Sequence, residues 1–379
     1  MRKKWFKKNL GYLKMKKISS NILLLPGDGV GPEVIKEAIK VIDYFNTSNI
    51  CNITYDSAEI GGIAIDNSNN PLPQTTIEKA KSSNCILLGA VGTKKHENNE
   101  NKLKPESGLL ALRKLLNLYI NVRPVFLFPS LVDSSSLKPE YIKDLDIVII
   151  RELIGDVYFG EPRGFDNNNQ TGFNTMKYSV DEVSRIAKYA FEISMRRAKK
   201  VTSVDKANVL ETSQLWRETV SSVAKDYDQV DLSHMYVDNA AMQLIRNPKQ
   251  FDVILTANLF GDILSDEASM LTGSIGMLPS ASLSNSHALY EPIHGSAPDI
   301  AGKNIVNPIA MILSVAMMFE YSFQAVEISN IIRQSVENVL KAGVVTKDIS
   351  QSKDYVTTSE MGSKILEEIK NNVWKKRII

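Results

Sequence analysis

The sequence predicts an α/β protein built around a largely parallel β-sheet, and three observations support this. Short β-branched or leucine-rich runs alternate with helical patterns, as strands and their covering helices do in such folds. These runs are almost wholly apolar, which is typical of strands buried on both faces. The length of 379 residues exceeds that of a usual single domain, so two domains are expected.

The expected strands share a short apolar core of five residues. They cover residues 21–25, 85–89, 146–150, 200–204 and 252–256. The first is followed by the glycine-rich turn 26–32 and then by apolar residues at helical spacing from Val34 to Phe45. We expect strand, turn and helix here, with Gly31 as N-cap and Pro32 in the first helical position, where a missing N–H costs nothing.

The turn Gly27-x-Gly29-x-x-Pro32 is one residue away from the dinucleotide-binding fingerprint. Proline replaces the third glycine, which in that motif allows the helix to pack closely on the strand. The pattern therefore weakens the case for an ordinary Rossmann fold. A tight turn without any ligand is an equally good interpretation.

Two further segments are distinctive. Residues 160–177, rich in Asn, Gly and Phe, are too long for an ordinary connection and are interpreted as an arm or a binding loop. Residues 308–319 are strongly apolar but fall well short of the ~20 residues that a membrane-spanning helix needs. We therefore expect a core helix there and no membrane partner.

Charge and cysteine content exclude several classes of function. Residues 1–17 carry eight basic side chains and no acidic one, so the remaining chain has 37 basic against 43 acidic residues, a net charge of −6. No basic face with interleaved aromatics accompanies the tail, so nucleic acid is not an expected partner. Residues 1–19 lack the features of a targeting signal and are expected to be a basic extension. With only Cys51 and Cys85, in no ligand-like spacing, a reducing cytoplasmic setting is expected.

Three arginines point to an anion site. Arg151 directly follows a buried run, and burying a guanidinium costs free energy unless an anion meets it. Arg113 and Arg123 precede it along the chain, and each guanidinium can hold a carboxylate through two parallel hydrogen bonds. Singly, such arginines are more often salt-bridged surface residues. Together they favour a site for a di- or tricarboxylate.

Acidic residues suggest a metal site. Asp262 and Asp266 stand four apart, which places both carboxylates on one face of a helix, where they repel unless a cation lies between them. Asp238 could add a third oxygen ligand. All-oxygen ligation selects Mg²⁺ or Mn²⁺ over zinc or copper. From spacing alone, a solvated acidic face is the better interpretation.

A lysine and a glycine-punctuated loop complete the candidates. Lys206 follows an expected strand and has apolar neighbours in sequence, where desolvation would lower its pKa towards that of a useful base. A lysine whose ammonium reaches solvent is the alternative. In the loop 294–302, Asp299 could accept hydrogen bonds from ribose hydroxyls and would repel a 2′-phosphate, which favours NAD⁺ over NADP⁺.

Five motifs, in this order, resemble the β-decarboxylating dehydrogenases that act on isopropylmalate, isocitrate, homoisocitrate and tartrate. They cover residues 25–33, 158–164, 202–209, 258–266 and 294–302. The resemblance implies an isopropylmalate/isocitrate dehydrogenase-like fold with a mixed, largely parallel sheet, in which the cofactor lies against the loop 294–302. It implies a domain made of residues 20–118 plus 273–379, a second domain of residues 119–272, and a dimer arm near residues 160–177.

The resemblance also implies roles for individual residues in a homodimer with shared active sites. Arg113, Arg123 and Arg151 would bind the carboxylates of a 2-hydroxy dicarboxylate. Mg²⁺ or Mn²⁺ would be held by Asp262, Asp266 and the partner subunit's Asp238, which would also contact the substrate. The partner subunit's Lys206 would be the base and Tyr158 would help to protonate the enol. NAD⁺ would be contacted by Glu106, Glu291, His294, Gly295, Ser296, Ala297, Asp299 and Asn307.

The substrate is expected to follow from the residues before Arg113. Isocitrate relatives resemble Ser-x-Asn-x-x-Leu-Arg here, whereas this chain keeps Ser107 but has Leu109 in place of asparagine. With Leu110 and the partner subunit's Val209, Leu109 would form an apolar pocket that suits an isopropyl group and disfavours an unpaired carboxylate. NAD⁺-dependent oxidative decarboxylation of isopropylmalate is therefore expected.

Other functions stay open beside this expectation. Within the enzyme class, the alternatives are dehydrogenases of the tartrate, methylmalate or isocitrate type, because a leucine-lined pocket can accept smaller groups. From other classes, a regulatory subunit or a simple NAD-binding module should lack the base, the tyrosine or a metal aspartate. This chain has all of these residues, which argues against both.

Overall fold

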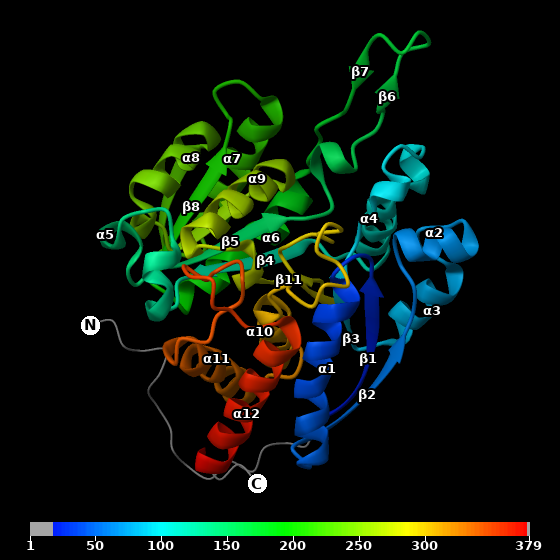
Figure 1. The fold of residues 1–379 in the computed structure, drawn as a ribbon. Helices are drawn as coiled ribbons and strands as arrows, with labels where there is room; N and C mark the ends of the chain where they lie inside the picture. The colour runs from blue at the N-terminus through cyan, green and yellow to red at the C-terminus, as the bar shows by residue number, and fades with distance from the viewer. Residues whose placement is uncertain (1–17, 377–379) are drawn as a thin grey trace.

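The structure is a computed structural model that describes residues 18–376. A ten-stranded sheet runs through the whole molecule, in the order β2-β1-β3-β12-β11-β4-β5-β10-β8-β9 (Figure 1). Six neighbouring pairs are parallel and three, around β11 and β4, are antiparallel. The prediction of a mixed, largely parallel sheet is confirmed. Most of the expected basic extension lies outside the described residues; its last two positions, Ile18 and Ser19, instead begin β1.

The order of the strands separates the sheet into two sets that meet where β11 pairs with β4. One set comes from the two ends of the chain and contains β2 (Cys51–Ser57), β1 (Ile18–Gly27), β3 (Cys85–Ala90), β12 (Ala288–Pro292) and β11 (Pro279–Leu283). The other set contains β4 (Ile120–Phe126), β5 (Asp146–Glu152), β10 (Val253–Thr256), β8 (Lys200–Asp205) and β9 (Asp231–Tyr236). This order is consistent with the expected domains, but one apolar core cluster extends across both sets. The domain boundaries stay a prediction.

The helices around the sheet follow the same separation in Figure 1. Those of the first set are α1 (Gly31–Thr47), α2 (Gly62–Ser68), α3 (Gln74–Ser82), α4 (Pro105–Leu115), α10 (Ile309–Tyr321), α11 (Val326–Lys341) and α12 (Thr358–Lys376). Those of the second set are α5 (Pro139–Ile142), α6 (Val180–Met195), α7 (Glu211–Ala224), α8 (Val237–Arg246) and α9 (Asn258–Ser269). Short 3₁₀ turns connect several of them, among them η4 (Asp156–Tyr158).

The turn after β1 differs from its prediction by one residue. Helix α1 has Val30 as its N-cap and already includes Gly31, so Pro32 is not its first residue. Gly29 has a φ of 56°, and a Cβ there would collide with the carbonyl group of Ser296. The backbone N–H of Val30 donates to that same carbonyl oxygen at 2.9 Å. The turn therefore packs against the loop 294–302 at Ser296.

Helix α10 is the expected core helix. Every residue from Ile309 to Phe319 is buried, so the helix is covered on all sides by protein. In the described part of the chain, no helix combines the length and apolar character that crossing a membrane requires. Residues 160–177 form a projecting arm with the two-stranded sheet β6 (Gly164–Phe165) and β7 (Gly172–Phe173), as Figure 1 shows at the top.

Candidate active site

A cavity of about 270 Å³ lies at the carboxyl ends of β3 and β5. Polar and apolar candidates from distant parts of the chain meet in its wall: Glu106, Leu109, Leu110, Arg113, Arg123, Arg151, Tyr158, Asp262, Glu291, His294 and Gly295. The prediction that the three arginines lie together is confirmed. Their charges and the two leucines give the cavity an anion-binding part and an apolar part.

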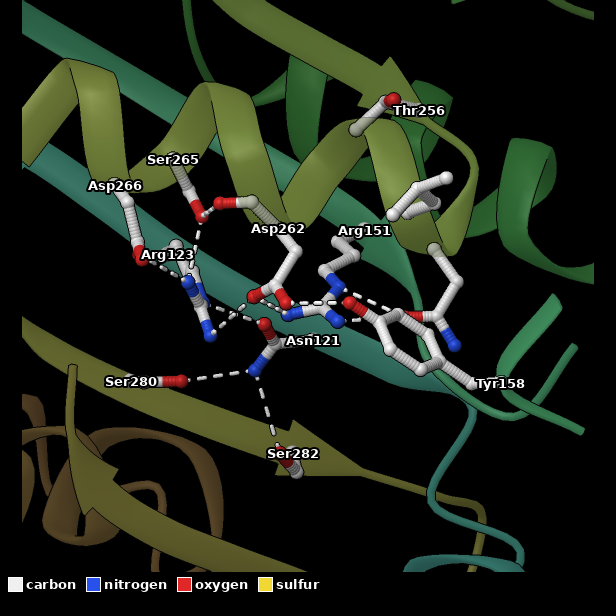
Figure 2. Close-up of polar contacts among 12 residues, drawn as sticks. Asn121, Arg123, Arg151, Tyr158, Thr256, Asp262, Ser265, Asp266, Ser280 and Ser282 are labelled. Atoms are coloured by element: carbon white, nitrogen blue, oxygen red, sulfur yellow. Dashed lines mark hydrogen bonds and ion pairs between the residues drawn. The ribbon is translucent and has the colours of Figure 1, made fainter. Parts of the chain in front are cut away.

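Arg151 is held by helix α9, which follows β10. Its Nη1 donates to Asp262 Oδ1 at 2.6 Å (Figure 2). Its Nε and Nη2 both donate to Asn258 Oδ1, at 3.0 and 2.6 Å. Gly261 permits this approach, because a Cβ there would lie 2.7 Å from Arg151 Cγ. Burial and the neighbouring Arg123 lower the pKa of Arg151 to about 10, so the side chain stays charged at neutral pH.

Arg123, in the middle of β4, is held by residues of α9 and by a neighbour on its own strand. Its Nη1 donates to Ser265 Oγ at 2.6 Å and to Asp266 Oδ1 at 3.1 Å, and its Nε donates to Asn121 Oδ1 at 2.8 Å. The amide of Asn121 in turn donates to the hydroxyl oxygens of Ser280 and Ser282 on β11, as Figure 2 shows. The guanidinium is therefore oriented before any ligand binds.

Arg113 on α4 pairs with Glu291 at the end of β12, at 2.7 Å. Its Nε is buried and has no hydrogen-bond partner among residues 18–376. A buried donor without a partner costs free energy, so an acceptor from a ligand would improve this position. The orphaned Nε therefore fits a carboxylate in the cavity.

Tyr158 and Asp262 form a hydrogen-bonded pair in the wall of the cavity. The hydroxyl of Tyr158 donates to Asp262 Oδ2 at 2.8 Å. Burial and the charge of Asp262 raise the pKa of Tyr158 to about 12, so the tyrosine keeps its proton. Burial alone would raise the pKa of Asp262, but Arg151 and Arg123 outweigh it and the pKa is lowered. Tyr158 can thus act as a proton donor beside an ionised carboxylate.

Asp262 and Asp266 lie on the same face of α9, as predicted, and both contact Arg123. Burial raises the pKa of Asp266, partly opposed by Arg123. Within residues 18–376 no group of three or more His, Cys, Asp or Glu side chains is close enough to hold a metal ion. The two carboxylates offer the oxygen atoms that Mg²⁺ and Mn²⁺ prefer, and the described residues of one chain bring no third His, Cys, Asp or Glu side chain to them.

Lys206, Asp238 and Val209 are absent from the wall of this cavity. Lys206 Nζ lies 2.7 Å from Asp238 Oδ1, and 63% of the Asp238 side chain and 61% of Val209 are exposed. The expected apolar setting of Lys206 is incomplete for the single chain, because its ammonium faces the carboxylate of Asp238 as well as the ring of Tyr236, 6.0 Å from the ring centroid. Whether the three residues act in the cavity of a second subunit stays a prediction.

The cofactor candidates divide into two groups. His294 and Gly295 line the cavity with Glu106 and Glu291, and His294 Nε2 is buried without a hydrogen-bond partner in the described chain. Burial lowers the pKa of His294, so the ring is neutral at pH 7. This orphaned ring nitrogen fits a polar group of a dinucleotide.

The other cofactor candidates lie beyond the cavity wall. Asp299 is exposed and Ala297 packs against the core. Ser296, within the loop 294–302, is buried. Asn307 is also buried and donates to Asp348 Oδ2 at 3.0 Å. Their roles towards NAD⁺ stay predictions.

Two supporting residues were missed by the sequence reasoning. Asn258 receives two donors from Arg151, and Ser265 receives one from Arg123. Both stand on the same helical face as Asp262, three or four residues away, so the helical spacing that singled out the aspartates could have found them.

The cavity at the carboxyl edge of this largely parallel sheet is lined by three arginines, by Asp262 and by a protonated tyrosine, with Asp266 one helical turn away. These features define a class of enzyme that handles acidic small molecules. The chain belongs to the isocitrate/isopropylmalate dehydrogenase family, which matches residues 21–365. It is 55% identical to the 3-isopropylmalate dehydrogenase of Wolinella succinogenes over 344 residues, 90% of this chain and 96% of that protein. It is 54% identical to that of Thiobacillus denitrificans over 349 residues, 91% and 99% of the two chains.

Solved structures agree with this assignment. The isocitrate dehydrogenase from Methylococcus capsulatus superposes with a TM-score of 0.83 at 33% identity, covering 92% of this chain and 99% of that one. A β-decarboxylating dehydrogenase from Thermococcus kodakarensis gives a TM-score of 0.76 at 32% identity, covering 93% and 96%. The predicted family and fold are confirmed.

Proposed function

We propose that this chain is an NAD⁺-dependent 3-isopropylmalate dehydrogenase of leucine biosynthesis, which converts (2R,3S)-3-isopropylmalate into 4-methyl-2-oxopentanoate and CO₂. The observation that carries the proposal is the wall of the cavity, where three arginines lie with Leu109 and Leu110. Three guanidinium groups suit the two carboxylates of a malate. The leucines suit its isopropyl group.

The start of helix α4 supports this substrate over isocitrate. The hydroxyl of Ser107 donates to backbone carbonyl oxygens of Lys104 and Lys102, at 2.7 and 3.0 Å. Ser107 is absent from the cavity wall, whereas Leu109 and Leu110 are part of it. A third carboxylate beside these leucines would be desolvated without a partner, which is costly.

The chain's own residues account for binding and proton movement. Arg113, Arg123 and Arg151 hold the carboxylates, and the leucines keep water from the neighbouring carbon. The partner subunit's Lys206 takes the proton of the substrate hydroxyl as the carbon that bears this hydroxyl is oxidised. After CO₂ leaves, Tyr158, which retains its proton, supplies one to the enol.

Cofactor and metal have fitting residues. NAD⁺ would lie along Glu106, Glu291, His294 and Gly295, and a divalent ion would be held by Asp262, Asp266 and the partner subunit's Asp238. Bound NAD⁺ would supply the hydride acceptor, and bound Mg²⁺ or Mn²⁺ would supply Lewis-acid stabilisation of negative charge on the substrate oxygen.

A homodimer with shared active sites is part of the proposal. Large apolar side chains are exposed on α8, on α9 and directly after it, and on the arm: Met242, Ile245, Ile263, Met270, Phe165 and Phe173. A contact between two copies over these surfaces would bury them. The proposed compartment is the cytoplasm, since both cysteines are buried free thiols, as expected where disulfides do not form.

The experiment is NAD⁺ reduction by the purified chain with Mg²⁺ or Mn²⁺, comparing 3-isopropylmalate, isocitrate, tartrate and malate at equal concentration. We expect strong preference for 3-isopropylmalate. Preference for isocitrate would leave the chemistry standing and refute the leucine pocket. No turnover of any of the four would refute the proposed enzyme function.

A further inference from the structure

We propose that Glu152 is a positioning residue which, through Tyr178 and Asn258, sets the guanidinium of Arg151 for the substrate carboxylate. The inference rests on the proposed function, because it assigns a role within that substrate site. Glu152 does not line the cavity, and its side chain is fully buried. It directly follows Arg151 on β5, so the two side chains leave the strand on opposite faces of the sheet.

The first path from Glu152 passes through a tyrosine. The hydroxyl of Tyr178 donates to Glu152 Oε2 at 3.1 Å and accepts the backbone N–H of Asn258 at 3.0 Å. Burial and the charge of Glu152 raise the pKa of Tyr178 well above its ordinary value, so this hydroxyl keeps the proton that it donates. The path fixes the backbone at the first residue of α9.

The second path passes through the turn after β5. The backbone N–H of Gly155 donates to Glu152 Oε2 at 2.8 Å, and that of Ile154 donates to Oε1 at 3.2 Å. The carbonyl oxygen of Gly155 then accepts the side-chain amide of Asn258 at 3.1 Å. This contact orients the amide so that its oxygen faces Arg151, where it receives both Nε and Nη2.

The two paths thus converge on one asparagine, which holds one edge of the Arg151 guanidinium. Asp262 holds Nη1 of the same group at 2.6 Å. Loss of Glu152 would release Asn258 at both its backbone and its amide and leave Asp262 as the only fixed partner. Burial raises the pKa of Glu152 to about 7, and in the described chain its one ion-pair partner is Arg185 at 3.8 Å, so a carboxyl at this position is costly. The proposed positioning role gives a reason for a carboxyl there.

The test uses full-length protein with Glu152→Gln, Tyr178→Phe and the double variant, and Glu37→Gln as the matched control. Glu37 is also a buried glutamate, with 2% exposure, but it lies in α1 and pairs with Lys40. For each single site variant we expect the KM for 3-isopropylmalate to rise about tenfold, with kcat and the KM for NAD⁺ changed less than about twofold. The control should change neither KM.

The double variant separates positioning from general loosening. If both residues act along one path, the double variant should resemble the more affected single variant, since coupled residues are not additive. Tyr178→Phe removes only a hydroxyl, so it carries the test if Glu152→Gln fails to fold. Wild-type turnover, measured first, tests the proposed function by itself. With an active wild type, an unchanged KM for 3-isopropylmalate in the folded variants, a parallel rise in the KM for NAD⁺, or full additivity would overturn the inference.

Discussion

The arginine cluster (Arg113, Arg123 and Arg151) and the Lys206–Asp238 pair differ in how much of their geometry one chain supplies. Each arginine is buried and held by side chains of its own chain. The Lys206–Asp238 pair lies outside the cavity, with Asp238 largely exposed. The difference teaches that one chain by itself fixes the geometry of the three arginines, whereas the proposed role of Lys206 depends on a second copy of the chain.

The largest expected effect concerns the Lys206–Asp238 pair. Lys206→Met should lower kcat by about 10³-fold, as loss of a general base does, with NAD⁺ binding and melting temperature unchanged. Steady-state kinetics, titration with NAD⁺ and thermal unfolding measure the three quantities. Lys225→Met, at an exposed lysine that ends α7, is the control. Retained turnover would refute the assigned role of Lys206.

Mixed dimers would test directly whether the two regions act in different subunits. Lys206→Met and Arg151→Met should each be inactive alone. Random co-assembly should restore about one quarter of wild-type activity, because half of the dimers are mixed and each has one intact shared site. Co-expression with two affinity tags and an activity assay provide the measurement. If both residues served the same chain's site, mixing would restore nothing.

The apolar part of the buried region should control substrate choice. Leu109→Asn should lower kcat/KM for 3-isopropylmalate by about 10- to 100-fold and shift the relative preference towards isocitrate. Leu115→Asn, at an exposed leucine of the same helix, should leave preference unchanged. Competition assays with both substrates give the ratio. An equal loss for both substrates would show that Leu109 is structural only.

The smallest expected effect is on stability and again separates the two regions. Burial raises the pKa of Glu152 from 4.5 to about 7, so the stability that its protonated form contributes is present below about pH 4.5 and is lost as pH rises through 7. Between pH 5.5 and 7.5 the wild type should lose about 2 kcal/mol relative to Glu152→Gln. The measurement is urea unfolding at each pH.

The Lys206–Asp238 pair supplies the control for that pH series. The hydrogen bond from Lys206 lowers the pKa of Asp238 from 3.8, so any contribution to stability is lost only as pH falls below that value. Asp238→Asn should therefore follow the wild type between pH 5.5 and 7.5. A pH dependence of Asp238→Asn in that window that differs from the wild type's would contradict the contrast between the two regions.

Much of the fold was predictable because local patterns determine it. The five expected strands, the helix after Pro32 and the buried helix α10 all follow from hydrophobic periodicity and length. The arginines could be proposed as a group because a charge at the end of a buried strand needs a partner. These inferences need no knowledge of tertiary contacts.

The supporting contacts could not be predicted in the same way. Arg151 and Asn258 are 107 residues apart, and Arg123 and Ser265 are 142 apart, so no local pattern joins them. Glu152 stands two residues beyond the expected strand 146–150, and its burial is visible only in the folded chain. The ion pair of Lys206 with Asp238 was missed because the two residues are 32 apart in the sequence.

The pairing of β3 with β12 has a consequence for how the chain is made. Ile86 pairs with Leu289, so β3 leaves the ribosome about 200 residues before its neighbour, a wait on the order of 10–40 s at usual synthesis rates. The strands β5, β8, β9 and β10 all lie within residues 146–256 and can assemble meanwhile. During that interval the edge of β3 that later pairs with β12 has no partner strand, and an unpaired strand edge is prone to aggregation. We therefore expect this nascent segment to bind a chaperone.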